Sequence, residues 1–190
     1  MIHIQRNITM NKIIFNERSL NKLIGCITGE ILLAYEGQEL PVLIGIKTRG
    51  ANLATKINIE IEKYTGRALN VGYLDISFYR DDLSKLAEQP LIKQPQIHFD
   101  INNRKVLLID DVLYTGRTTK AALDALVAIG RPKEVKLAVL IDRGHREFPI
   151  EANFVGKKLE TTDNEVVHVH FKETDGIDNV EICNKKFDKS

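Results

Sequence analysis

Two adjacent carboxylates and a hydroxyl-rich turn stand together in the middle of the chain. An apolar run, 106–109, leads through Asp110 and Asp111 into Thr-Gly-Arg-Thr-Thr at 115–119. We expect 115–119 to lie where a turn enters a helix, because free backbone N–H groups and the positive helix end bind a phosphate monoester there. A glycine in this turn lets the backbone approach the phosphate closely. The residues assigned to the phosphate are Thr115, Gly116, Arg117, Thr118 and Thr119.

The acid pair needs a partner other than the phosphate, which it would repel. Vicinal sugar hydroxyls suit Asp110 and Asp111, since a carboxylate accepts two hydrogen bonds well. The stretch lacks the GxxxxGK[ST] pattern of a Walker A loop, so phosphate and diol together indicate ribose 5-phosphate rather than a nucleoside triphosphate. Taken alone, an Asp-Asp pair would more often cap a turn, but the whole stretch from Val106 to Thr119 favours the binding role.

Strands and helices that alternate along the chain would position this turn. Short apolar runs predict buried strands, and apolar residues at helical spacing predict helices, the first with Ser19 as its cap. Residues Asn102 and Asn103 indicate a hairpin turn between strands at 97–101 and 105–109. The alternation predicts an α/β fold, a mostly parallel twisted sheet with helices on both faces. The other expected elements are helices at 19–35, 51–64 and 118–129 and strands at 41–46, 68–78 and 135–141.

Three polar turns directly follow predicted strands. In such sheets, ligands bind at the carboxyl ends of the strands, so we expect the three turns to form one site. They are Lys47-Thr48-Arg49-Gly50, the stretch from Asp110 to Thr119, and Asp142-Arg143-Gly144-His145-Arg146.

Composition fits one soluble enzyme domain spanning residues 1–190. The chain has 190 residues, 43% of them hydrophobic, which suffices for one substantial core. Its 27 basic and 26 acidic residues nearly balance, so a globally basic nucleic-acid binder is not indicated. The two cysteines belong to no zinc or disulfide pattern. No apolar run approaches the ~18 residues of a membrane span, so we expect a soluble, cytoplasmic protein.

The turn from Val106 to Thr119 resembles the PRPP-binding signature of type I phosphoribosyltransferases, where PRPP is phosphoribosyl pyrophosphate. Its variant Asp-Asp-Val-Leu-Tyr-Thr-Gly-Arg-Thr is similar to that of the bifunctional pyrimidine operon attenuator/uracil phosphoribosyltransferase family. Three further segments, 45–50, 75–84 and 140–149, resemble that family's other motifs in the same order. The resemblance covers residues 13–171.

The resemblance implies a type I phosphoribosyltransferase that converts uracil and PRPP to UMP and pyrophosphate in pyrimidine salvage. Asp110 and Asp111 would hold the ribose, with Lys47, Thr48, Arg49 and Gly50 around the pyrophosphate. Mg²⁺ would be held mainly by substrate and water, with Asp110 and Asp111 as the side chains that could contribute. The nucleobase would meet Asp142, Arg143, Gly144 and His145, and a homodimer or higher homo-oligomer is expected.

The resemblance also implies a core at 13–171, a small hood at 142–165 and a flexible β-hairpin loop at 79–97 that closes over PRPP. Within that loop, Arg80 would neutralise the pyrophosphate. The polar tail 172–190 is expected to be partly loose.

Attenuators of this family bind messenger RNA through a basic face that includes the first helix. In this chain Gly25, Cys26 and Gly29 occupy the positions of those basic residues, leaving Arg146, Lys157 and Lys158 as candidates. RNA binding depends on phosphate neutralisation, so we expect it to be weak or absent. Three alternatives stay open: a uracil enzyme without strong RNA binding, an attenuator regulated by UMP or UTP, and a type I enzyme for another nucleobase.

Overall fold

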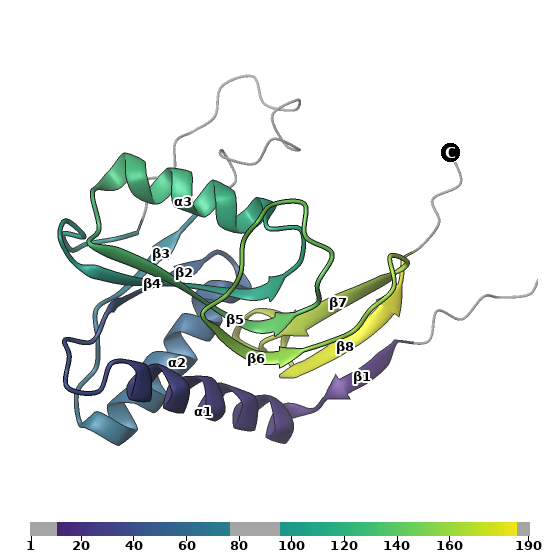
Figure 1. Ribbon diagram of the computed structural model, residues 1–190. Helices are drawn as coiled ribbons and strands as arrows, with labels where there is room; N and C mark the ends of the chain where they lie inside the picture. Colours follow the sequence, from purple (N-terminus) through teal and green to yellow (C-terminus); the bar gives the residue numbers. More distant parts are fainter. Residues whose placement is uncertain (1–10, 77–95, 186–190) are drawn as a thin grey trace, which may run out of the picture.

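The centre of the molecule is a five-stranded sheet in which every neighbouring pair of strands is parallel (Figure 1). The computed structural model describes residues 11–76 and 96–185. The strand order is β3-β2-β4-β5-β6, so β4 lies in the middle. The strands are β2 (Val42–Ile46), β3 (Val71–Leu74), β4 (Lys105–Leu113), β5 (Glu134–Asp142) and β6 (Phe154–Lys158).

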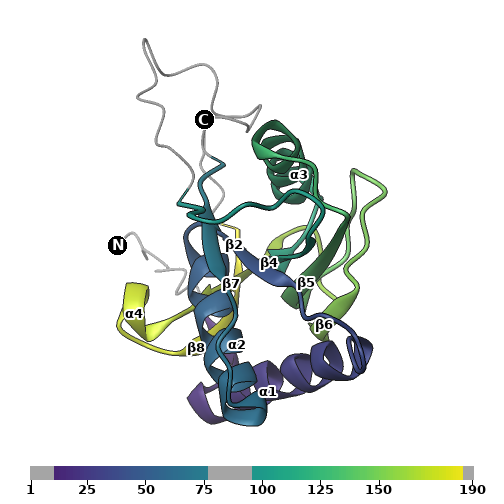
Figure 2. The same cartoon turned by 90° about the vertical axis from the view of Figure 1, so that its left-hand side faces the viewer.

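Helices cover both faces of this sheet (Figures 1 and 2). Helices α1 (Glu17–Ala34) and α2 (Arg49–Thr65) pack on one face, and α3 (Arg117–Ile129) packs on the other. Side chains alternate accordingly along β4: Leu107 and Ile109 belong to the core under α1 and α2, whereas Val106 and Leu108 belong to the core under α3. Burial on both faces explains the uninterrupted apolar runs, and the predicted α/β fold is confirmed.

A second, antiparallel sheet joins the two ends of the described chain. It consists of β1 (Lys12–Phe15), β8 (Asn179–Asn184) and β7 (Glu165–His170), in that order, with the short helix α4 (Lys172–Asp175) between β7 and β8. Val167, Val169 and Val180 of this sheet enter the core under α1 and α2. The small sheet is therefore an integral layer of the domain.

Two predicted regions contain regular elements of the two sheets. The range 142–165, expected to be the hood, contains β6, which belongs to the main sheet, and the small sheet is built from the chain ends instead. The range 172–190, expected to be a partly loose tail, contains α4 and β8. The predicted loop at 79–97, with its hairpin and Arg80, falls almost wholly outside the described residues.

Three local predictions also need correction. Helix α1 is capped by Asn16, whose Oδ1 accepts the Ser19 N–H at 3.0 Å, rather than by Ser19. Residues 97–101 form no strand, so the predicted hairpin with 105–109 is absent among the described residues. Helix α2 begins at Arg49, two residues before its predicted start. In the part of the chain that the structure describes, no helix is long and apolar enough to span a membrane.

Candidate active site

The acid pair lies at the carboxyl end of the central strand. Strand β4 continues to Leu113, so Asp110 and Asp111 belong to the strand itself rather than to the turn that follows. Asp110 is 6% exposed and its Oδ1 accepts the Asp111 N–H at 3.0 Å, while Asp111 is half-buried. The pair is thus fixed by a rigid element, which favours a binding role over a capping role.

Glycine at position 50 brings the start of α2 against this pair. A Cβ at Gly50 would lie 2.5 Å from the Ile109 carbonyl oxygen and 3.3 Å from Asp110 Oδ1. Any side chain would therefore push α2 away from β4. Gly50 has a helical conformation that any residue could adopt, so glycine is needed here for its small size and not for its backbone freedom.

The pKa of Asp111 is raised above its ordinary value. Desolvation by burial is the largest cause; a hydrogen bond from the Asp110 side chain and the positive charge of Arg49 oppose it. Because the charge of Arg49 acts on the pKa of Asp111, the Arg49 guanidinium interacts electrostatically with the acid pair. Two of the three predicted turns therefore converge on one point.

The third stretch of the predicted site, 115–119, forms the turn into α3. Gly116 adopts φ +90°, a left-handed conformation that disfavours other residues. Within the described residues, the Thr119 hydroxyl is buried and makes no hydrogen bond. The Arg117 side chain pairs with Glu147 and lies over the Phe148 ring, and the Arg117 N–H donates to Thr115 Oγ1 at 3.4 Å.

The turn into α2 has a similar construction. Lys47 and Thr48 form the turn, joined by a cis peptide bond, and the Lys47 N–H donates to the Leu74 carbonyl at 2.9 Å. Thr48 is the N-cap but its side chain makes no capping hydrogen bond. Arg49 and Gly50 are the first residues of the helix, not part of a loop as predicted.

The starts of α2 and α3 differ from the start of α1. Neither N-cap residue, Thr48 or Gly116, gives a side-chain capping bond, and neither helix has an acidic residue in its first turn. Helix α1, by contrast, has the Asn16 cap and Glu17 in its first turn. Because uncapped N–H groups and the helix dipole attract anions, the site offers two anion-binding helix ends on either side of a carboxylate pair.

The predicted nucleobase segment, 142–146, is tied into its surroundings. Arg143 is 4% exposed, stacks over Tyr114 with its guanidinium carbon 4.2 Å from the ring centre, and donates to Thr161 and Thr162. His145 Nε2 lies 2.7 Å from the Thr161 carbonyl oxygen, and its Nδ1 lies 2.9 Å from Asp163. The segment borders an open cavity of about 530 Å³ with Ala152, Val155 and residues 158–161.

Arg146 connects the nucleobase segment to the phosphate turn. It pairs with Asp142 at 2.6 Å, and donates to the carbonyl groups of Tyr114 at 2.8 Å and Ile150 at 2.9 Å. Asp142 Oδ1 also accepts the Gly144 N–H. The sequence placed Arg146 in the third polar turn and among the candidate RNA contacts, but it did not predict this internal role. The signal in the sequence was the opposite charge of Asp142 and Arg146, which are four residues apart.

A second missed residue is Asp175, in α4. Its carboxylate binds Arg49 through two hydrogen bonds, although 126 positions separate the two residues. The sequence holds no local signal for this contact, because 172–190 has the composition of a loose tail. Arg80, the remaining predicted site residue, lies outside the described residues.

Similarity to known proteins agrees with this geometry. Residues 10–175 match the model of the phosphoribosyl transferase domain family. The protein called Bifunctional protein PyrR from Deinococcus deserti is 53% identical over 156 residues, which are 82% of this chain and 85% of that protein. The protein of the same name from Elusimicrobium minutum is 46% identical over 179 residues, 94% of this chain and 100% of that protein.

Solved structures of lower identity share the fold. The hypoxanthine phosphoribosyltransferase of Trypanosoma cruzi has a TM-score of 0.71 at 18% identity and covers 92% of this chain and 97% of its own. A hypoxanthine phosphoribosyltransferase from Staphylococcus aureus has a TM-score of 0.65 at 22% identity, covering 98% of each chain. The chain therefore belongs to the phosphoribosyl transferase domain family and, within it, to the family of the proteins called Bifunctional protein PyrR.

Proposed function

We propose that this protein transfers ribose 5-phosphate from PRPP to uracil, forming UMP and pyrophosphate. One observation carries the proposal: two helix starts without side-chain caps flank an acid pair at the carboxyl edge of the sheet. PRPP has the matching order of groups, a phosphate monoester, a ribose diol and a pyrophosphate. The site matches PRPP both in charge and in the order of its groups, and a single anion-binding site would not match that order.

The monoester end belongs to the turn into α3. Backbone N–H groups of residues 116–119 would bind the 5-phosphate, with the hydroxyl groups of Thr115 and Thr118 as further donors. The buried Thr119 hydroxyl, which lacks a partner within the described residues, would gain one from a phosphate oxygen. Asp110 and Asp111 would accept hydrogen bonds from the ribose hydroxyls, which requires the carboxylates to be ionised.

The pyrophosphate end belongs to the turn into α2. Lys47 and Arg49 supply positive charge, and the helix start around Thr48 and Gly50 supplies N–H donors. In the reaction a base nitrogen forms a bond to the anomeric carbon as the bond from that carbon to the pyrophosphate oxygen breaks, and the proton of the base nitrogen passes to solvent or to the departing pyrophosphate. Stabilising the departing negative charge is the contribution expected of this turn, and Arg80 stays a prediction for the same role.

The base would lie beside the 142–146 segment. Because the side chains of Arg143 and His145 already bind residues 161–163, we propose that they shape the base pocket more than they pair with the base edge. Asp142 and Gly144 are likewise engaged with each other and with Arg146. Similarity to the PyrR relatives supports uracil as the base in this proposal, and another nucleobase is the alternative.

Mg²⁺ fits the donors of this site only as a partly hydrated ion. No group of three or more His, Cys, Asp and Glu side chains that could hold a metal occurs among residues 11–76 and 96–185. Mg²⁺ commonly takes one or two carboxylates and completes its shell with water and substrate phosphates, so Asp110 and Asp111 would suffice on the protein side. When bound, the ion would neutralise part of the charge on the pyrophosphate.

A base-selectivity assay tests the proposal. Purified protein is incubated with PRPP and Mg²⁺ and with uracil, hypoxanthine, guanine or orotate, and nucleotide formation is followed by chromatography. We expect UMP to form fastest. Faster IMP, GMP or OMP formation would replace uracil by another base, and no nucleotide from any base would contradict the transferase.

RNA binding is the second candidate function, because the relatives are named bifunctional. Two observations disfavour it: Cys26 and Gly29 are exposed on α1 and carry no charge, and Arg146 is engaged internally. Lys157 and Lys158 are exposed on the edge strand β6 and remain available. Gel shifts with pyrimidine leader RNA across a salt series should give no salt-sensitive complex; a complex with a steep salt slope would establish the regulator.

A further inference from the structure

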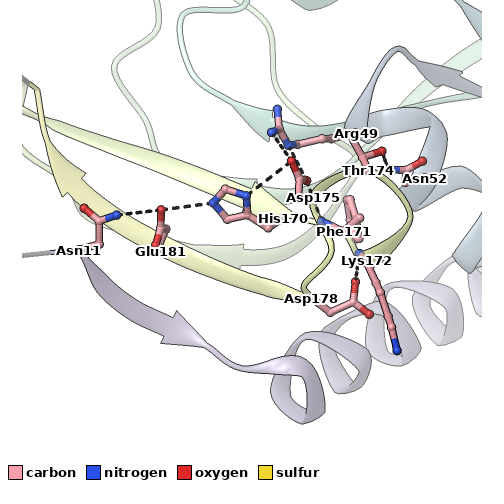
Figure 3. Close-up of polar contacts among 10 residues, drawn as sticks. All are labelled: Asn11, Arg49, Asn52, His170, Phe171, Lys172, Thr174, Asp175, Asp178 and Glu181. Carbon is pink, nitrogen blue, oxygen red and sulfur yellow. Dashed lines mark hydrogen bonds and ion pairs between the residues drawn. The ribbon is translucent and has the colours of Figure 1, made fainter.

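Arg49 is held along one edge by a carboxylate from the far end of the chain. Its Nε donates to Asp175 Oδ2 at 3.2 Å and its Nη2 donates to Asp175 Oδ1 at 2.8 Å (Figure 3). A guanidinium has five N–H donors in one plane, so this paired contact uses two donors and fixes the plane of the group. The other edge stays directed away from Asp175, with the Arg49 side chain still 36% exposed.

Asp175 is itself fixed from several directions. Its Oδ2 also accepts the Phe171 N–H at 3.0 Å, and its Oδ1 lies 3.7 Å from His170 Nδ1. His170, the last residue of β7, in turn lies 3.2 Å from Glu181 of β8, within the small sheet (Figure 3). The side chain of Asp175 is only 14% exposed. A carboxylate held this way acts as a rigid anchor.

Separate contacts attach the same segment to α2 without involving Arg49. Asn52 donates to Thr174 at 2.6 Å, and Lys56 pairs with Asp178 at 3.3 Å. Asp178 also accepts the Lys172 N–H at 2.7 Å. The segment 171–178 would therefore stay on α2 even without Asp175. Attachment of the segment to α2 therefore does not require the contact between Asp175 and Arg49, and this contact needs another explanation.

Asp175 also partly neutralises the charge of Arg49. This neutralisation would weaken the attraction of Arg49 for an anion. A weaker attraction is tolerated where the direction of the N–H donors matters more than the net charge. This is the case when a planar guanidinium must bind one phosphate group in a fixed orientation. The positive charge of Arg49 also acts to lower the pKa of Asp111, so the anchored group influences the acid pair as well as α4.

We propose that Asp175 is a positioning residue that holds Arg49 in the orientation needed to bind the pyrophosphate group of PRPP. The inference rests on the proposed function, since it assigns a further residue to the same site. Asp175 touches no reacting atom in this account and acts only through Arg49. The small sheet thereby becomes part of the construction of the active site.

The experiment compares two carboxylates of the same segment, D175A and D178A. Both variants lose one ion pair to α2, so thermal denaturation should show that both are folded with lowered stability. Only D175A should raise the Michaelis constant for PRPP, by about tenfold, and weaken inhibition by pyrophosphate to a similar extent. The Michaelis constant for uracil should change little in either variant, and D175E should recover part of the loss.

Two further variants test whether Asp175 acts through Arg49. R49A should weaken PRPP binding, and the double variant R49A/D175A should weaken it no further. Calorimetric titration with pyrophosphate alone gives the same comparison without turnover. Additive losses in the double variant, or equal kinetics for D175A and D178A, would overturn the inference.

Failure of the proposed function has a different outcome. If the unsubstituted protein neither binds PRPP nor transfers its ribose to any base, the function is wrong and this inference falls with it. If the unsubstituted protein is active while D175A matches it in PRPP and pyrophosphate constants, only the role of Asp175 is wrong.

Discussion

The two turns that we propose to bind anions are built in different ways. The turn into α3 is contained in one stretch, 106–119, in which strand, acid pair, glycine and helix start follow each other. The turn into α2 has its main cation, Arg49, anchored by Asp175 across 126 positions of the chain. The first turn is built mainly from consecutive residues, although Arg146 donates to the Tyr114 carbonyl and the N–H groups of Glu147 and Phe148 donate to the Thr115 carbonyl. The second turn also depends on α4, so substitutions in α4 can damage it.

The largest effect is expected inside the local stretch. Asp111→Asn should lower kcat/KM for PRPP by about ten- to a hundredfold, because a hydrogen bond to an ionised group contributes about 1.5–3 kcal/mol. Steady-state kinetics measure the change. Asp124→Asn is the matched control, since Asp124 is an exposed carboxylate of α3 whose partner, Lys120, is on the same helix. Equal kinetics for the two variants would remove Asp111 from the site.

A second substitution tests the backbone of the same turn. Gly116→Ala should cost about 1–2 kcal/mol of folding stability from its left-handed conformation and should also raise the Michaelis constant for PRPP. Gly66→Ala is the control: Gly66 has φ +69° at the end of α2, and a Cβ there would meet nothing within 4 Å. If both variants lose stability but neither changes PRPP binding, the phosphate does not contact this turn.

A smaller effect is expected in the pH dependence of stability, where Asp111 and Asp175 should act in opposite directions. The pKa of Asp111 is raised, chiefly by burial, so its ionisation costs stability above that raised pKa, and the cost disappears as pH falls toward the ordinary value. Burial alone would raise the pKa of Asp175 too, but hydrogen bonds from Arg49 and the Phe171 N–H and nearby positive charge lower it overall. Its contribution is therefore present above the ordinary pKa and lost as pH falls through the lowered one.

Denaturant unfolding measured from pH 7 down to about pH 3 checks this contrast. At pH 7 Asp111→Asn should raise the free energy of unfolding and Asp175→Ala should lower it. Both differences should shrink as the medium becomes acidic. The same sign for both variants at pH 7 would contradict the opposite electrostatic roles.

The smallest effect belongs to the helix start outside the site. Asn16→Ala should cost about 1 kcal/mol of stability by removing the cap of α1, with no change in either Michaelis constant. Chemical denaturation and kinetics on the same preparation measure both. A change in PRPP binding would mean that the contrast between capped and uncapped helix starts has no functional meaning.

The sequence was most informative where structure is local. Continuous apolar runs predicted the buried strands because parallel strands covered on both faces need no polar alternation. The turn at 115–119 was predicted because phosphate binding needs a glycine and a helix start in direct succession. The acid pair was placed in a turn, whereas β4 continues through Asp110 and Asp111, since hydrogen bonding to β5 extends that far.

Long-range pairing explains what the sequence did not predict. Asn102 and Asn103 do form a turn, with Asn103 at φ +56°, but β4 already pairs with β2 and β5, so no edge was free for a hairpin partner. The small sheet pairs Lys12 with Ile182, and short strands so far apart carry no mutual signal. The contact between Arg49 and Asp175 is also long-range, since 126 positions separate the two residues.

The arrangement of phosphate and sugar is tested most directly by crystals of the protein soaked with UMP. The account predicts the phosphate within hydrogen-bonding distance of the backbone N–H groups of residues 116–119 and the ribose hydroxyls on Asp110 and Asp111. UMP bound elsewhere, with that turn and acid pair left untouched, would contradict it.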